Sequence, residues 1–211
     1  MEVLLKKNTT GKVYCIILPL REIYCIMITT GKLNCRIIPT VDFYCKMINT
    51  AKLYSITILK GEFYCITITT GQFYCWIITT FELHCISIPT GEFYRIKINT
   101  GEFFCRIIPT GEFYCIMITT GKLYHMIIPI WEFYCIMNTT GKLYCIIVPT
   151  RVFYCIMITT GKVYCIIIHT GEISCRMITT WKLCLIMITL GEFCIWWGLY
   201  SPDNIKHSYS S

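Results

Sequence analysis

Apolar and polar residues repeat along the chain with a period of ten. From Gly11 to Tyr200 the sequence divides into nineteen ten-residue units, of which GKLYCIIVPT at 141–150 is typical. Within a unit, Gly stands at position 1, Lys or Glu at 2, Leu or Phe at 3, Tyr at 4 and Cys at 5. Ile or Met follows at positions 6 to 8, and Thr or Pro before Thr ends the unit. Aromatic and β-branched side chains favour a strand of six or seven residues. A helix is disfavoured because Gly, Thr pairs and Pro recur every ten residues.

The gap between strands, Thr-Thr-Gly-Lys or Pro-Thr-Gly-Glu, predicts a tight turn. It fits a three-residue hairpin loop, in which a type I turn is followed by Gly in the left-handed conformation. In that register position 5 of one unit faces position 5 of the next, and positions 3, 5 and 7 share one face. We expect this Cys-bearing face to form the core and the Tyr-bearing face to meet solvent. Arg95 and Lys97 fall on the expected core face.

These elements predict an all-β fold. Nineteen strands in one open sheet would span roughly 90 Å, and open sheets seldom pass about ten strands without curling or splitting. We therefore expect an antiparallel meander that curls into a barrel or a two-layer sheet. The alternative is a β-solenoid with two strands in each twenty-residue coil. The predicted organisation is an N-terminal lead-in at 1–10, the repeat array at 11–200 and a polar C-terminal tail at 201–211.

The charged residues at position 2 add a second period of twenty. Lysine units alternate with acidic units at first, the alternation then lapses, and it resumes one unit out of phase. An ancestral twenty-residue unit with a later slip of ten residues would give this pattern. The alternating residues are Lys12, Glu22, Lys32, Asp42, Lys52 and Glu62; the lapse covers Gln72, Glu82, Glu92, Glu102 and Glu112; and Lys122 resumes the series.

Composition narrows the function classes. Hydrophobic residues make up 55% of the chain and charged residues 15%, which argues against disorder. The net charge is +7, but the basic residues form no run, so we expect no nucleic-acid partner. Two stretches, Phe63–Phe81 and Leu183–Tyr200, approach what a membrane span needs, and we favour buried strands over membrane association. The start of the chain lacks an export signal, so an intracellular location is the default and the compartment stays unknown.

Sixteen cysteines are the most conspicuous candidates for chemistry. Fourteen of them occupy position 5, from Cys15 to Cys175, while Cys184 and Cys194 occupy position 4. Adjacent cysteines in the meander register would lie close enough for a cross-strand thiol or disulfide ladder. The plainer interpretation is that Cys serves as a small buried hydrophobe, and we favour it. The spacing of ten does not resemble the paired ligands of structural zinc sites, so we predict no metal site.

No other residue pattern predicts a catalytic, cofactor-binding or metal-binding residue. The four histidines, His84, His125, His169 and His207, replace consensus residues or lie in the tail, and none belongs to a catalytic motif. Phosphate-binding and dinucleotide-binding glycine motifs are absent from the sequence. The Tyr row at position 4 could stack bases or sugars, but we favour cross-strand packing. We therefore expect no enzyme, no cofactor and no small-molecule ligand.

The expected function follows from the repeat itself. Ten residues correspond to thirty nucleotides, so duplication of one unit keeps the reading frame open. This favours a repeat-derived protein with no identifiable biochemical activity. The alternatives are a structural or self-assembling β-repeat protein, such as an adhesive, coat or fibre component, and a membrane-associated hydrophobic protein. Segments such as 113–118, FYCIMI, combine β-propensity with an absence of charge, so we expect self-association through sheet edges.

Overall fold

A computed structural model describes residues 3–18 and 22–199 of the chain, and these residues form seventeen β-strands and no helix. The strands are β1 (Val3–Thr10), β2 (Val13–Ile17), β3 (Ile23–Thr30), β4 (Leu33–Ile37), β5 (Phe43–Asn49), β6 (Leu53–Leu59), β7 (Phe63–Thr69), β8 (Phe73–Thr79), β9 (Leu83–Pro89), β10 (Phe93–Asn99), β11 (Glu102–Ile107), β12 (Phe113–Ile127), β13 (Phe133–Ile147), β14 (Val152–His169), β15 (Glu172–Thr179), β16 (Lys182–Thr189) and β17 (Phe193–Leu199).

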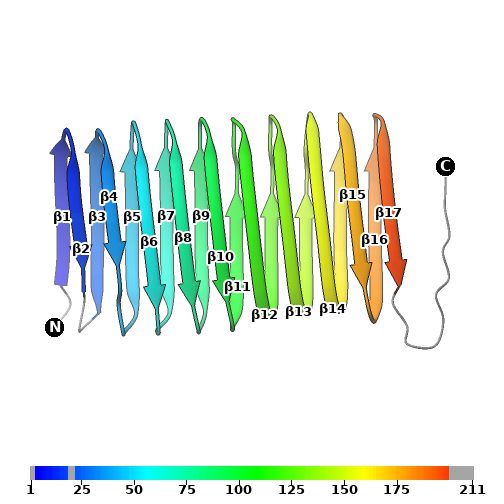
Figure 1. The fold of residues 1–211 in the computed structure, drawn as a ribbon, viewed down its shortest axis with the longest axis horizontal. Coiled ribbons are helices and arrows are strands. Elements are labelled where there is room, and N and C mark those ends of the chain that lie inside the picture. Colours follow the sequence, from blue (N-terminus) through cyan, green and yellow to red (C-terminus); the bar gives the residue numbers. More distant parts are fainter. Residues whose placement is uncertain (1–2, 19–21, 200–211) are drawn as a thin grey trace.

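All strand pairs are parallel, and each residue pairs with the residue twenty positions later. Phe43 of β5 pairs with Phe63 of β7, for example, and Cys45 pairs with Cys65. The chain therefore winds as a β-solenoid with two ten-residue units in each coil, and the coils stack along one straight axis (Figure 1). The predicted antiparallel meander is wrong in strand direction, and the alternative, a solenoid with twenty-residue coils, is confirmed.

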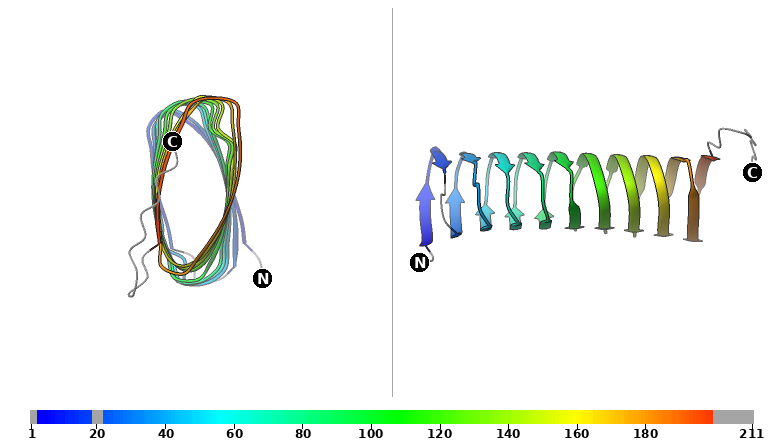
Figure 2. Two further views of the ribbon diagram at one scale, coloured as in Figure 1. Left: turned by 90° about the vertical axis from the view of Figure 1, so that its right-hand side faces the viewer. Right: turned by 90° about the horizontal axis from the view of Figure 1, so that it is seen from below.

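Each coil has two broad walls joined at two narrow edges, as the end view in Figure 2 shows. Wall A contains β2, β4, β6, β8, β10, the first parts of β12 to β14, β15 and β17. Wall B contains β1, β3, β5, β7, β9, β11, the second parts of β12 to β14, and β16. The name edge A denotes the row of turns that precede the wall A strands. The name edge B denotes the row of turns that precede the wall B strands.

The core lies between the two walls. Along β5 the inward residues Phe43, Cys45 and Met47 are buried, whereas Lys46 between them is exposed. Positions 3, 5 and 7 of both walls point inward in this way, so the prediction that the Cys-bearing face forms the core is confirmed. Position 9 joins them, since Thr69 and its equivalents are also buried. Closing each coil lets both walls bury their apolar faces against one another, which a single open sheet could not do.

The turns explain why the chain does not form hairpins. A hairpin with a three-residue loop needs a residue in the left-handed conformation at every turn, yet no non-glycine residue of the described ranges has a positive φ. Phe81 and Trp131 occupy the glycine position with ordinary backbone angles. At Gly141 φ is +134°, and a Cβ there would collide with the carbonyl oxygen of Gly121 in the coil before. Glycine at that position is needed for close stacking of backbones rather than for chain reversal.

The stacked inner rings give a stability prediction. Phe133 is fully buried between Phe113 and Phe153, with ring centroids 4.8 and 5.3 Å away. Phe133→Ala should lower the free energy of local opening by about 3–5 kcal/mol, because it leaves a cavity in the core. Ile136→Ala, on the solvent side of the same strand, should cost about 1 kcal/mol or less. Hydrogen exchange of the amides in β12 to β14 measures both values, and equal losses would contradict the assignment of inner and outer faces.

Candidate functional site: open ends and charged edges

The cysteines at position 5 line the interior in two rows, one on each wall, whereas Cys184 and Cys194 at position 4 lie on the outward face. Thirteen of the sixteen are buried, Cys15 is half-buried, and Cys184 and Cys194 near the C-terminal end are exposed. Cysteines of adjacent units lie on opposite walls, so the predicted contact between them within one sheet is wrong; the neighbours within a wall are twenty residues apart, as Cys25 and Cys45 are. Burial raises the pKa of the Cys75 thiol to about 12. A buried, protonated thiol fits the interpretation of Cys as a core residue.

Two buried cations interrupt the wall A interior in β10. Arg95 and Lys97 are 2% and 1% exposed, as their positions in the repeat predict. The Arg95 guanidinium donates hydrogen bonds to Ser87 Oγ at 3.2 Å, to Cys105 Sγ at 3.5 Å and to Cys85 Sγ. Hydrogen bonds from Cys105 and Cys65, together with the charge of Arg95, hold the pKa of Cys85 well below its usual range. The hydroxyl and sulfur acceptors around Arg95 thus satisfy hydrogen bonds of a charged group that would be costly to bury alone.

His125 replaces the consensus Cys on wall B. It is buried, and within the described residues neither ring nitrogen has a hydrogen-bond partner. Burial and the charge of Arg95 lower the pKa of His125 to about 3, so the ring is neutral near pH 7. Among residues 3–18 and 22–199, no three His, Cys, Asp or Glu side chains gather in a group that could hold a metal ion.

The outward tyrosines form stacked ladders along both walls. On wall B the rings of Tyr124 and Tyr144 lie 4.8 Å apart with planes 5° from parallel, and His84 and Phe104 continue the same row. This confirms that the Tyr row serves packing between strands. Each ring covers the face of the next, so a base or sugar finds no free ring face inside the row.

An open groove of about 790 Å³ runs beside the wall B ladder, between the aromatic row and the aliphatic row at position 6. Its lining spans the coils from Tyr64 to Ile186, and Arg106 is the one residue there with a permanent charge. The groove presents ring edges and aliphatic side chains. Its lining also includes His84 and, at position 5, buried cysteines and His125.

The charged residues at position 2 collect at the two edges, where each faces water. Because coils contain twenty residues, alternation between lysine and acidic units places like charges one above the other. On edge B the acidic row ends at Glu102 and a lysine row begins at Lys122. On edge A a lysine row ends at Lys52, Gln72 follows, and an acidic row begins at Glu92. The slip of ten residues in the sequence therefore reverses the sign of both edges halfway along the solenoid.

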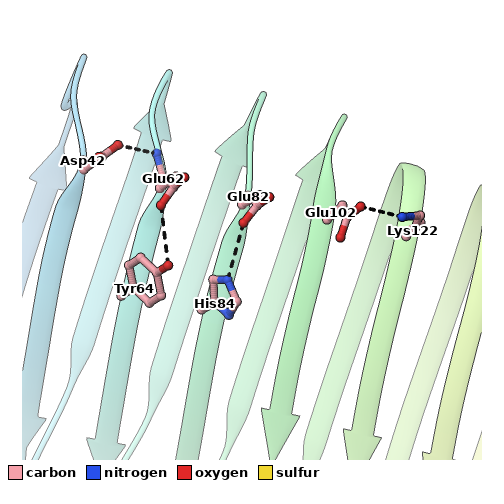
Figure 3. Close-up of polar contacts among 7 residues, drawn as sticks. All are labelled: Asp42, Glu62, Tyr64, Glu82, His84, Glu102 and Lys122. Carbon is pink, nitrogen blue, oxygen red and sulfur yellow. Dashed lines mark hydrogen bonds and ion pairs between the residues drawn. The ribbon is translucent and has the colours of Figure 1, made fainter.

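Figure 3 shows the edge B row around its change of sign. Lys122 Nζ lies 2.7 Å from Glu102 Oε1, and this ion pair raises the pKa of Lys122. On the acidic side, Asp42 Oδ1 accepts a hydrogen bond from the backbone N–H of Glu62 at 2.9 Å. Two like charges one strand spacing apart repel by about 1 kcal/mol in water. Within one chain, neighbouring charges of edge B attract each other only where the acidic row meets the lysine row.

The two ends of the solenoid expose strands that lack an outer neighbour within the described residues. At the N-terminal end, β1 pairs with β3 and β2 pairs with β4, and neither has a second neighbour in its wall. At the C-terminal end, β16 pairs with β14 and β17 with β15. The inward residues of these coils are correspondingly less buried: Val13 and Leu185 are half-buried, whereas Leu123 is fully buried.

Comparison with known proteins adds no relative. No protein family, curated protein or solved structure matches the chain. Within the described residues, no helix has the length and apolar character needed to cross a membrane. The repeat β-solenoid is consistent with a structural repeat protein.

The buried His125 gives a prediction for acid conditions. Its pKa is near 6.5 in the unfolded chain and about 3 in the folded one, so protons bind preferentially to the unfolded chain between these values. This contribution to the free energy of unfolding is fully present above pH 6.5 and is lost as the pH falls toward 3. At pH 5 the loss should be about 2 kcal/mol relative to pH 7.5.

His125→Cys, which restores the consensus residue, should remove this part of the acid sensitivity. Urea unfolding of the wild type and the variant at pH 7.5 and pH 5 measures the difference, and other groups that titrate in this range affect both proteins alike. An identical pH dependence in the two proteins would show that His125 is not buried and neutral in the fold.

Proposed function

We propose that this chain is a structural, non-catalytic protein that assembles by stacking its solenoid end to end with other copies. The observation that carries the proposal is that β1 and β2 at one end, and β16 and β17 at the other, have no outer neighbour within residues 3–18 and 22–199 and share the same twenty-residue register. A copy added at either end would continue the coil without a change of strand spacing or direction. Exposed strand edges of this kind are templates for pairing with another chain.

The direction of the backbone hydrogen bonds makes the two ends complementary. The N–H of Ile173 donates to Glu192 O in the following coil at 3.1 Å, and the N–H of Thr50 donates to Thr29 O in the preceding coil at 3.1 Å. In the strands, the N–H and C=O groups of odd-numbered residues thus point toward the following coil, and those of even-numbered residues point toward the preceding coil. By this alternation Leu185 directs its groups out of the C-terminal end, and Tyr14 directs its groups out of the N-terminal end.

Charge and apolar surface support a head-to-tail junction. Continuing the edge A row from one copy into the next brings Glu192 beside Lys12, which carry opposite charges. The end coils also expose large apolar side chains that a neighbouring coil would cover in part, such as Tyr14 at 77% exposure and Ile186 at 53%. Burial of apolar surface contributes about 25 cal/mol per Å², so several such ladders together favour stacking.

A substitution at the C-terminal end tests the proposal. Leu185→Lys places a charge at an inward position that stacking would bury, so it should abolish filament growth while leaving the single solenoid folded. Ile188→Lys is the matched control, because residue 188 points outward, keeps contact with solvent after stacking and would lie beside the uncharged Asn8 of the next copy. Electron microscopy and sedimentation measure filament length for the wild type and both variants.

We expect filaments of stacked coils from the wild type and from Ile188→Lys, and single particles from Leu185→Lys. Circular dichroism checks that all three proteins retain β-structure. Monodisperse wild-type protein at high concentration would overturn the proposal. A protein that pellets only with lipid and requires detergent for solubility would instead support the membrane-associated alternative.

A further inference from the structure

The edge B charge row has a symmetry that the end-to-end contact does not use. From Asp42 to Glu102 it carries only acids at position 2, and from Lys122 to Lys182 only lysines. The residues lie one strand spacing apart, about 4.8 Å, so the row is a regular charge pattern about 34 Å long. Four acids thus precede four lysines of opposite charge, and Glu22 extends the acidic half by one further residue.

We propose that edge B binds edge B of a second copy that runs in the opposite direction. A two-fold axis between Glu102 and Lys122, perpendicular to the solenoid axis, places the acidic half of each copy on the lysine half of the other. Because both copies have the same spacing, all positions come into register together. The resulting contacts, each formed twice, are Glu102 with Lys122, Glu82 with Lys142, Glu62 with Lys162, and Asp42 with Lys182.

This antiparallel arrangement is favoured over the other ways of placing two copies side by side. Two parallel copies that meet at edge B would set acids on acids and lysines on lysines, which is repulsive. Edge A offers a less regular pattern, because Gln72 and Val152 interrupt its row and Arg151 lies within its acidic half. In the described turns beside the four acids from Asp42 to Glu102, Lys60 is the one cation.

The side chains concerned are accessible. The side chains of Lys122 and Glu102 are 43% and 37% exposed, and that of Glu82 is 47% exposed. A second copy would also relieve the repulsion between like charges that each row suffers alone. The contact is narrow and made of exposed ion pairs, so it should be reversible and sensitive to salt. It builds on the proposed self-assembly, yet it can form between two single copies.

Zero-length carbodiimide cross-linking followed by mass spectrometry tests this arrangement in the full chain. Within one copy, Glu82 and Lys142 lie three coils apart, about 14 Å along the axis, beyond the reach of a direct amide bond. A Glu82–Lys142 cross-link therefore requires a second, antiparallel copy, and so does Glu62–Lys162. End-to-end stacking would instead link Glu192 to Lys12, so the two modes of assembly give different products.

We expect the Glu82–Lys142 and Glu62–Lys162 products at low salt and at least a tenfold loss of both at about 0.5 M salt, where charges are screened within about 4 Å. The paired change Lys142→Glu with Lys162→Glu should reduce dimers by a similar factor. Adding Glu62→Lys and Glu82→Lys to that variant restores opposite charges across the two-fold axis and the original net charge, so dimers should return. Circular dichroism confirms that each variant folds.

The outcomes separate the two proposals. Absence of both cross-links in wild-type protein at low salt, or failure of the fourfold variant to regain dimers, overturns the antiparallel pairing. Single-width filaments without these cross-links leave the end-to-end proposal standing by itself. Salt-sensitive dimers with these cross-links but no filaments support the pairing and reject the end-to-end proposal.

Discussion

Parallel pairing in a twenty-residue register is the constraint on which the other features of this solenoid depend. It sets every side chain between two copies of its own position, one coil before and one coil after. For Phe, Ile and Tyr this is favourable, and stacked rings such as Tyr44 and Tyr64, with planes 7° apart, fill the walls. For charged residues the same rule is unfavourable. The array accordingly carries most of its charge at the edges, where water screens the repulsion.

The interior shows how far single units can depart from this rule. Arg95 and Lys97 sit where the repeat has Cys and an apolar residue, and both are buried. The Arg95 guanidinium donates hydrogen bonds to sulfur atoms of neighbouring units, and Lys97 Nζ lies 4.0 Å from the centre of the Phe103 ring. In a solenoid each coil contacts only its neighbours, so a costly substitution in one unit stays local and need not unfold the array.

The alternation of inward and outward residues was predictable from the sequence, whereas the strand direction was not. Ten is an even number, so equal positions share a face both in a hairpin meander and in a solenoid, and the core-facing set of Phe43, Cys45 and Met47 follows from either. The two folds differ only at the turn. There Thr-Thr-Gly-Lys resembles a hairpin loop, but the structure places Phe81 and Trp131 at the glycine position without a positive φ, so the turn does not reverse the chain as a hairpin does. The open ends and the charged edges could not be predicted, because both depend on which units become neighbours.

The change of sign at Glu102 and Lys122 shows what copy number does in such an array. Adding or losing two units shifts the downstream chain by a whole coil and leaves each residue type on its own side. Adding or losing one unit shifts it by half a coil, so every later residue moves to the opposite wall or edge. The hydrophobic core is indifferent to this exchange, since both walls present the same inward residues, but the surface is inverted. Odd and even repeat expansions are therefore different kinds of mutation. An even expansion lengthens the solenoid, whereas an odd one exchanges the outward residues of its two walls and edges in a single step and leaves the core almost unchanged.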